Sequence, residues 1–167
     1  MQIVSDKLAP GRGPDHHARI LQLLSDYVHC IDDGRYEEWP EFFCDPCSYR
    51  IVTRASLQRG YEAGIIDCES KGMLIDRVSS LRRANIYEPH VYRHLLGPTR
   101  VSSGTVDEVS ARTGFVVMRT VEGQSTEPFV SGVYDDRFVY ERGELRIAER
   151  LVVLDSSCVD TLLVIPL

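Results

Sequence analysis

The sequence lacks the short motifs by which many enzyme classes are recognised. It contains no Gly-rich phosphate-binding loop, no Gly-x-Ser-x-Gly segment and no His-Glu-x-x-His segment, so the hydrolase and phosphoryl-transfer classes have no support. Long apolar runs are missing too, because the longest, residues 162–167, is far below the ~20 residues that span a bilayer. No signal-peptide pattern opens the chain. We therefore expect a cytoplasmic protein that does not bind membranes.

Lysine is scarce. Lys7 and Lys71 are the only lysines among the 19 basic residues. The 25 acidic residues outnumber the basic ones, so the chain has a formal net charge of -6 and a pI near 5.4. A chain without excess positive charge cannot neutralise many phosphates, so nucleic-acid binding is not expected. The other 17 basic residues are arginines. Their planar fork suits bidentate pairs at protein interfaces, and a GC-rich genome produces the same bias.

The cysteines are few and scattered. Cys30, Cys44, Cys47, Cys68 and Cys158 are an odd number in a chain large enough to fold without disulfides, so we expect reduced, buried thiols. The first pair with close spacing, Cys44 and Cys47, matches half of a zinc site, but no second pair follows to complete it. We expect no metal in this chain.

The length and composition favour one domain. The chain has 167 residues, of which 43% are hydrophobic and 26% charged, which is typical of a compact soluble domain. Residues 1–14, rich in glycine and proline around Pro10 to Pro14, lack periodicity and are predicted to form a flexible arm. Residues 15–167 are predicted to form the single domain.

Helical periodicity is confined to the first half of the chain. Residues 16–32 place apolar side chains on one helical face, with Asp15 as N-cap and Gly34 ending the helix. Residues 36–43 predict a second short helix, and residues 72–86 predict a third. The stretch between residues 54 and 69 is not assigned.

Strand patterns dominate the second half. Apart from one strand at residues 47–53, the predicted strands all follow Pro89 and are separated by turn signals, which favours an antiparallel meander; they cover residues 91–103, 105–122, 128–142, 145–155 and 159–165. Gly97-Pro98 predicts a bulge, because proline cannot donate to a ladder. Helices followed by an antiparallel sheet predict an α+β fold, with the helices packed against one face of the sheet.

His94 is the histidine with the strongest functional interpretation. It follows His90 and Arg93 at the start of the strand-rich region, and with a nearby acid (Asp76, Asp32 or Asp33) it would suit a general acid/base. The competing interpretation is a structural histidine held by hydrogen bonds, and we favour it.

Several segments together resemble the small subunits of Rieske-type aromatic-ring-hydroxylating dioxygenases. The resemblance covers the chain from about Leu23 to its end, and the segments that carry it are residues 30–39 running into Phe42-Phe43, 73–78, 93–95 and 143–155. Within that family, residues 30–43, 84–88 and 92–96 look closest to small subunits of oxygenases that act on aromatic carboxylates such as terephthalate, salicylate or halobenzoates.

The resemblance implies a cone-shaped, nuclear transport factor 2-like fold in a hexamer of three large and three small subunits. It also implies that the partner large subunit carries a Rieske iron–sulfur cluster and a mononuclear iron. This chain has no Cys-x-His pair and no convincing set of two histidines and a carboxylate, so we expect it to hold neither. Its implied role is non-catalytic: it trimerises and holds the large subunits so that electrons cross from one subunit's cluster to its neighbour's iron.

The residues carried over by the resemblance are structural. Trp39 would lock the helices to the sheet with Phe43, and His94 would bond within or across an interface. The arginines expected to pair with acids are Arg77, Arg93 and Arg150.

Two alternatives remain open. The first is a free-standing enzyme resembling scytalone dehydratase or ketosteroid isomerase, with an acid/base set in the mouth of the cone made of Asp33, Tyr49, Asp76 and His94. The second is a ligand-binding module of the same fold without catalysis.

Overall fold

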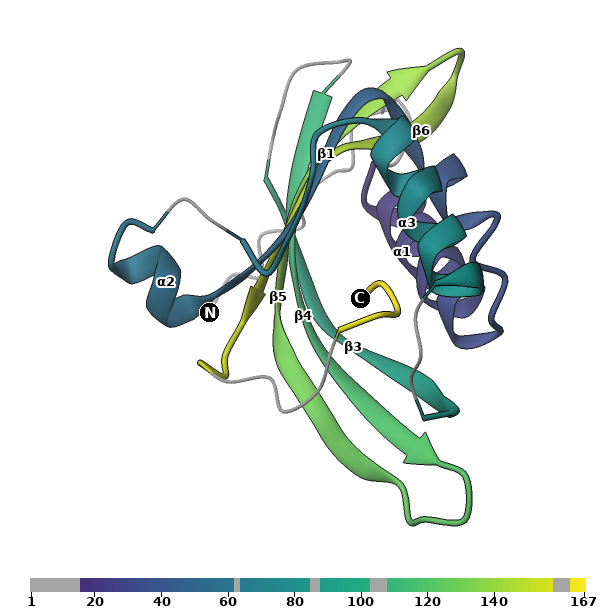
Figure 1. Ribbon diagram of the computed structural model, residues 1–167. Helices are drawn as coiled ribbons and strands as arrows, with labels where there is room; N and C mark the ends of the chain where they lie inside the picture. The colour runs from purple at the N-terminus through teal and green to yellow at the C-terminus, as the bar shows by residue number, and fades with distance from the viewer. Residues whose placement is uncertain (1–15, 62–63, 85–87, 103–107, 158–162) are drawn as a thin grey trace, which may run out of the picture.

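The computed structural model describes residues 16–61, 64–84, 88–102, 108–157 and 163–167. The predicted α+β class is confirmed: a curved sheet carries α1 and α3 on one side, while α2 projects from the other (Figure 1). The elements in chain order are α1 (His16–Asp32), the 3-10 helix η1 (Trp39–Phe42), β1 (Phe43–Thr53), α2 (Arg54–Gln58), β2 (Ile66–Cys68), α3 (Lys71–Arg83), β3 (His90–Ser102), β4 (Glu108–Val121), β5 (Glu127–Glu141) and β6 (Glu144–Leu154).

The sheet has six strands in the order β2-β1-β6-β5-β4-β3. β3 to β6 form the predicted antiparallel meander. β1 lies beside β6 in parallel and beside β2 in antiparallel orientation. The parallel pair joins strands from the two ends of the sequence, so no local turn signal could have predicted it.

The first helix has the predicted bounds. α1 buries Ile20, Leu24, Val28 and Ile31 at helical spacing, which is the core-facing stripe of an amphipathic helix. Gly34 has a φ of 72°, a left-handed conformation that glycine adopts without steric cost and that ends helices. The predicted N-cap, Asp15, and the predicted arm lie outside the described residues.

The second helix is shorter than predicted, and the first strand is longer. The helix covers only η1, in which Pro40 lies in the first turn, and Phe43 after it is already extended. β1 begins at Phe43 rather than at residue 47 and passes through an irregular stretch before Ser48, where its pairing with β6 resumes. The proline that was expected to separate the helix from the strand, Pro46, lies inside this irregularity.

The unassigned stretch contains α2 and β2. Thr53 caps α2 by accepting a hydrogen bond from the Ser56 backbone N–H at 3.0 Å, and Ser70 caps α3 by accepting one from the Met73 N–H at 3.3 Å. α3 confirms the third predicted helix but ends at Arg83; the last predicted residue, Ile86, lies outside the described residues.

The turn signals of the meander are confirmed. Glu141 pairs with Glu144, so Arg142 and Gly143 form a two-residue loop, and their φ values of 53° and 84° match a tight hairpin turn. The bulge predicted at Gly97-Pro98 is present as a register shift between Leu96 and Thr99.

The two faces of the sheet differ in character. We call the face toward α1 and α3 the inner face, and the opposite one the outer face. Inner-face side chains such as Tyr49, Phe115, Tyr134 and Val152 belong to the buried core. None of the helices in the described parts of the chain is long and apolar enough to cross a membrane.

The last predicted strand, residues 159–165, differs from the structure where it is described. Residues 159–162 lie outside the described part, and residues 163–167 are not a strand. They lie instead between the sheet and the helices (Figure 1). An apolar run is compatible with any buried conformation, so the pattern alone could not distinguish a strand from this segment.

Candidate functional site

His94 is buried and held by an aspartate. Its Nδ1 lies 2.6 Å from Asp32 Oδ1, and its backbone N–H donates to Asp32 Oδ2 at 2.9 Å. The two side chains are 0% and 2% exposed. A carboxylate accepts hydrogen bonds, so Nδ1 carries the proton in this pair. The other ring nitrogen, Nε2, is buried and has no hydrogen-bond partner among the described residues.

The other candidate acids lie elsewhere. Asp33 is half exposed and lies 3.6 Å from Arg35. Asp76 is exposed on α3. Of the three acids that the sequence offered to His94, the structure therefore places Asp32 against the ring, while Asp33 and Asp76 face solvent.

Tyr49 is fully buried and bound to the end of the sequence. Its hydroxyl accepts the Leu167 backbone N–H at 3.0 Å and lies 3.3 Å from the Leu167 carbonyl oxygen, to which the Tyr27 hydroxyl donates at 2.8 Å. Burial raises the pKa of both tyrosines, so both hydroxyls stay protonated at neutral pH. The Tyr49 hydroxyl is thus occupied by backbone groups.

A buried ion pair joins β5 and β6 on the inner face. Arg150 Nε and Nη2 donate to the two oxygens of Asp136 at 2.8 and 2.7 Å. The guanidinium carbon lies 4.0 Å from the centre of the Tyr27 ring and 4.3 Å from that of the Tyr134 ring. Burial lowers the pKa of Arg150, but the neighbouring carboxylate more than offsets this, so the pKa is raised and the guanidinium stays charged.

Trp39 and Arg77 also hold the interior together. Trp39 makes edge contacts with Phe43 and Tyr49, with ring centres 5.6 and 5.1 Å apart. Arg77 differs from the expectation that it pairs with an acid, because its Nη2 donates to the Leu163 carbonyl at 2.6 Å. Arg93 is 61% exposed and lies 3.5 Å from Asp32.

The thiols of the described cysteines are buried and free. Burial raises the pKa of Cys44 and Cys68, and raises that of Cys30 and Cys47 to about 11. Thiols with such pKa values are poor metal ligands and poor nucleophiles at neutral pH. In the described parts of the chain, no three or more His, Cys, Asp and Glu side chains are grouped so that they could hold a metal ion.

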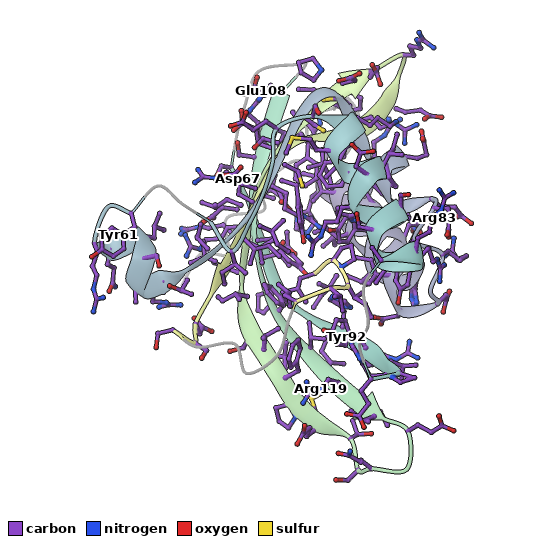
Figure 2. All side chains as sticks on the ribbon, in the orientation of Figure 1. Tyr61, Asp67, Arg83, Tyr92, Glu108 and Arg119 are labelled. Carbon is purple, nitrogen blue, oxygen red and sulfur yellow. The ribbon has the colours of Figure 1, made fainter. Side chains whose placement is uncertain are left out.

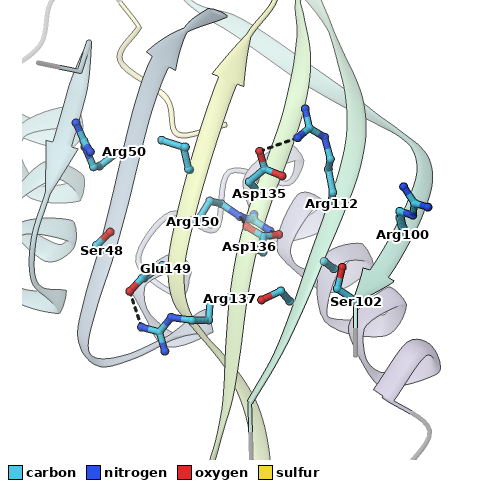
Figure 3. Close-up of a pocket in the computed structure, with 13 residues that line it drawn as sticks. Ser48, Arg50, Arg100, Ser102, Arg112, Asp135, Asp136, Arg137, Glu149 and Arg150 are labelled. Atoms are coloured by element: carbon cyan, nitrogen blue, oxygen red, sulfur yellow. Dashed lines mark hydrogen bonds and ion pairs between the residues drawn. The ribbon is translucent and has the colours of Figure 1, made fainter. Parts of the chain in front are cut away.

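The outer face carries a polar groove of about 620 Å³ (Figure 3). Two cross-strand rows line it. The first row contains Ser102, Ser110, Arg137, Glu149 and Ser48, and the second contains Arg100, Arg112, Asp135, Leu151 and Arg50.

The arginines of the groove are not all paired in the same way. Arg137 lies 2.6 Å from Glu149, and Arg112 lies 3.2 Å from Asp135. Arg100, directly opposite Arg112 in the ladder, has no ion pair among the described residues. Two like charges directly opposite each other destabilise a sheet unless a counter-charge lies nearby. The end of the groove at Arg100 and Arg112 therefore carries excess positive charge, although the chain as a whole is negative.

Sequence reasoning did not identify this groove. The signal was present as charged residues alternating with apolar ones in the last three strands. Alternation shows which residues share a face, but the rows also depend on the register between strands, which the sequence does not specify.

Comparison with known proteins assigns the chain to a family. Residues 15–151 match the SnoaL-like domain family. The chain is 44% identical over 149 residues to a subunit of the terminal oxygenase component of terephthalate 1,2-dioxygenase from Comamonas sp, subunit beta 1, covering 89% of this chain and 97% of that protein. It is 36% identical over 148 residues to the small subunit of anthranilate 1,2-dioxygenase from Burkholderia cepacia, covering 89% and 92%.

A solved structure gives the same result. A chain from Novosphingobium aromaticivorans, assigned as the β subunit of an aromatic-ring-hydroxylating dioxygenase, superposes with a TM-score of 0.81 at 35% identity, covering 89% of this chain and 94% of that one. The chain therefore belongs to the SnoaL-like domain family and, within it, to the β subunits of aromatic-ring-hydroxylating dioxygenases.

Proposed function

We propose that this chain is a structural subunit that performs no chemistry itself and that holds iron-bearing large subunits in a working arrangement. The observation that carries the proposal is the filled interior of the cone. Tyr49, which a free-standing enzyme would need in its pocket, is fully buried and bonded to Leu167. His94 is equally closed off, with 0% of its side chain exposed.

The assembly follows the resemblance. We infer a hexamer of three large and three small subunits, with the small subunits as a homotrimeric core. The large subunit supplies a Rieske cluster and a mononuclear iron, and this chain keeps neighbouring large subunits close enough for electron transfer between them. Identity to the terephthalate and anthranilate dioxygenase subunits favours aromatic carboxylates as the substrate class.

The residues that the resemblance singled out divide into two groups in this proposal. Trp39, His94 and Arg150 are buried, so they act by fixing the shape of the subunit. Arg93 is exposed and is the one of the set that can contact another subunit directly. Arg77 bonds to the chain's own carbonyls, so its role is internal.

We infer that the outer-face groove is the docking surface for the large subunit, through an acidic segment of that partner. Arg100 and Arg112 lie side by side in the ladder, and Arg100 has no ion pair among the described residues. A carboxylate from the partner would relieve the repulsion between the two guanidinium groups, because it pairs with both.

The experiment that tests the function is reconstitution. The chain purified alone should contain no stoichiometric iron, should be at least trimeric by light scattering, and should not oxygenate an aromatic carboxylate. Adding the large subunit with its reductase should give oxygenation that depends on both subunits. A turnover by the isolated chain that His94→Ala abolishes would contradict the proposal and support the dehydratase or isomerase alternative.

A further inference from the structure

Large apolar side chains are exposed where the chain stands off the outer face of the sheet. We call this part, residues 54–61 with 64 and 65, the α2 protrusion. Its Leu57, Tyr61 and Ile65 are 50%, 61% and 47% exposed, and α2 itself buries no residue. Figure 1 shows α2 projecting away from the sheet, and Figure 2 shows Tyr61 at the far end of this projection. A five-residue helix without packing of its own is not stable alone in water, so we expect another surface to cover it.

The base of the α2 protrusion is fixed to the sheet. Arg54 forms an ion pair with Asp155, which also accepts a hydrogen bond from the Ser131 hydroxyl at 2.9 Å. Thr53 caps α2 by accepting a hydrogen bond from the Ser56 backbone N–H. The fold therefore sets the direction in which the protrusion points. A partner would meet a preformed surface, which lowers the entropic cost of binding.

A second apolar surface lies at the opposite edge of the outer face. Val91 and Leu95 on β3 are 61% and 54% exposed, and they point outward because His94, which lies between them in the alternation, is buried on the inner side. On β4, the partly buried Val116 lies opposite Leu95, and Met118 follows it on the same face. We call Val91, Leu95, Val116 and Met118 the β3 patch.

The two surfaces carry complementary charges. Arg59, the C-cap of α2, is exposed and has no ion pair among the described residues. Glu88 and Glu122 are exposed just beyond the end of the β3 patch at which Val91 pairs with Thr120. Neither glutamate forms an ion pair within the described parts of the chain. An arginine on one surface and two carboxylates on the other attract each other across an interface.

The two surfaces of one chain do not cover each other. In the sheet order β2-β1-β6-β5-β4-β3, the α2 protrusion lies between β1 and β2 in the chain, while the β3 patch is at the far edge, and the side chains of both are exposed. Two copies can bring them together. A contact between two different surfaces leaves each copy with one free surface of each kind, so further copies add until a ring closes.

We propose that the α2 protrusion of one copy packs on the β3 patch of the next copy, and that three such contacts close the homotrimer. The number of copies rests on the proposed function, whereas the two surfaces come from this chain's own side chains. Arg59 of one copy then lies near Glu88 and Glu122 of its neighbour. The contact is distinct from the outer-face groove, from which the bulge at Gly97-Pro98 separates the β3 patch.

The first test is the mass of the isolated full-length chain in light scattering. Leu57→Glu with Tyr61→Glu places two carboxylates on the α2 protrusion, so we expect the mass to fall from that of a trimer to that of a monomer. Met73→Glu with Ile75→Glu makes the same change at exposed apolar positions of α3 and should remain trimeric. A protrusion variant that stays trimeric would overturn this inference and leave the proposed function standing. An unmodified chain that is monomeric would overturn both.

The second test identifies the paired surfaces and does not require a dissociated variant. Tyr61→Cys and Leu95→Cys are introduced into full-length Cys158→Ser chains, in which the other four cysteines are buried, and the proteins are treated with a short bifunctional maleimide. Each variant alone should give no cross-linked product, co-expression of the two should give a covalent dimer, and one chain carrying both should give a covalent trimer. Cross-linking of Tyr61→Cys alone, or no product in any combination from a chain that is still trimeric, would overturn the proposal.

Discussion

The inner and outer faces of the same sheet use charge in opposite ways. On the inner face, Arg150 and Asp136 form an ion pair that is fully buried between aromatic rings. One residue earlier in the chain, Asp135 pairs with Arg112 on the outer face, where the two side chains are 37% and 58% exposed. Adjacent aspartates thus serve different ends: the inner one fixes the structure of the subunit, and the outer one belongs to a surface available to a partner.

The largest loss of stability is expected from removing one partner of the buried ion pair. Asp136→Ala leaves the Arg150 guanidinium buried without its carboxylate, so we expect a loss of about 3–5 kcal/mol in the free energy of unfolding. The neighbouring change, Asp135→Ala, removes only an exposed ion pair and should cost less than about 1 kcal/mol. Urea unfolding of both variants measures the difference, and equal losses would contradict the contrast between the faces.

The second test concerns His94 on β3, the edge strand of the sheet against which α1 packs. His94→Ala removes the ring that donates to the buried Asp32 carboxylate, so we expect a loss of about 1–3 kcal/mol. His17→Ala, at an exposed position of α1, is the matched control and should change stability by less than about 0.5 kcal/mol. If thermal unfolding shows the two variants to be alike, His94 does not stabilise the subunit.

A third test sharpens the role of the outer face. Arg100→Glu should leave stability almost unchanged, within about 0.5 kcal/mol, and should weaken association with the large subunit. The effect should grow at low salt, because exposed charges are less screened there. Arg83→Glu makes the same charge change on α3, away from the groove, and should have no effect. If Arg100→Glu associates with the large subunit unchanged at low salt, the groove is not part of the interface, and the proposed function itself is not affected.

The smallest expected effect is a loss of folding stability at alkaline pH. Burial raises the pKa of Cys30 and Cys47 to about 11, from an ordinary value near 9. Their contribution to stability is therefore fully present below pH 9 and is lost as the pH rises through 11, because only the unfolded chain ionises in that window. Thiol titration at pH 8 in a Cys158→Ser background should detect no rapidly reacting cysteine until the chain is unfolded, and immediate reaction of these two thiols would contradict their burial.

The sequence was sufficient for elements governed by local patterns. The stripe of Ile20, Leu24 and Val28 with Gly34 after it defined the first helix to the residue, and Arg142-Gly143 marked the last hairpin. Both depend on neighbours within a few positions.

The sequence was not sufficient where partners are far apart. Tyr49 and Leu167 are 118 positions apart, and Asp32 and His94 are 62 apart. Three aspartates were compatible with His94, and only the packing of α1 against β3 selects one of them. The cross-strand rows of the groove likewise depend on the register of five strands.

The most direct test of the structural-subunit proposal is native mass spectrometry of this chain co-expressed with its large oxygenase subunit. The account predicts that the chain is found in a complex of three large and three small subunits, with all iron carried by the large ones. Finding the chain only as a free species, with the large subunit assembled and active without it, would contradict the account.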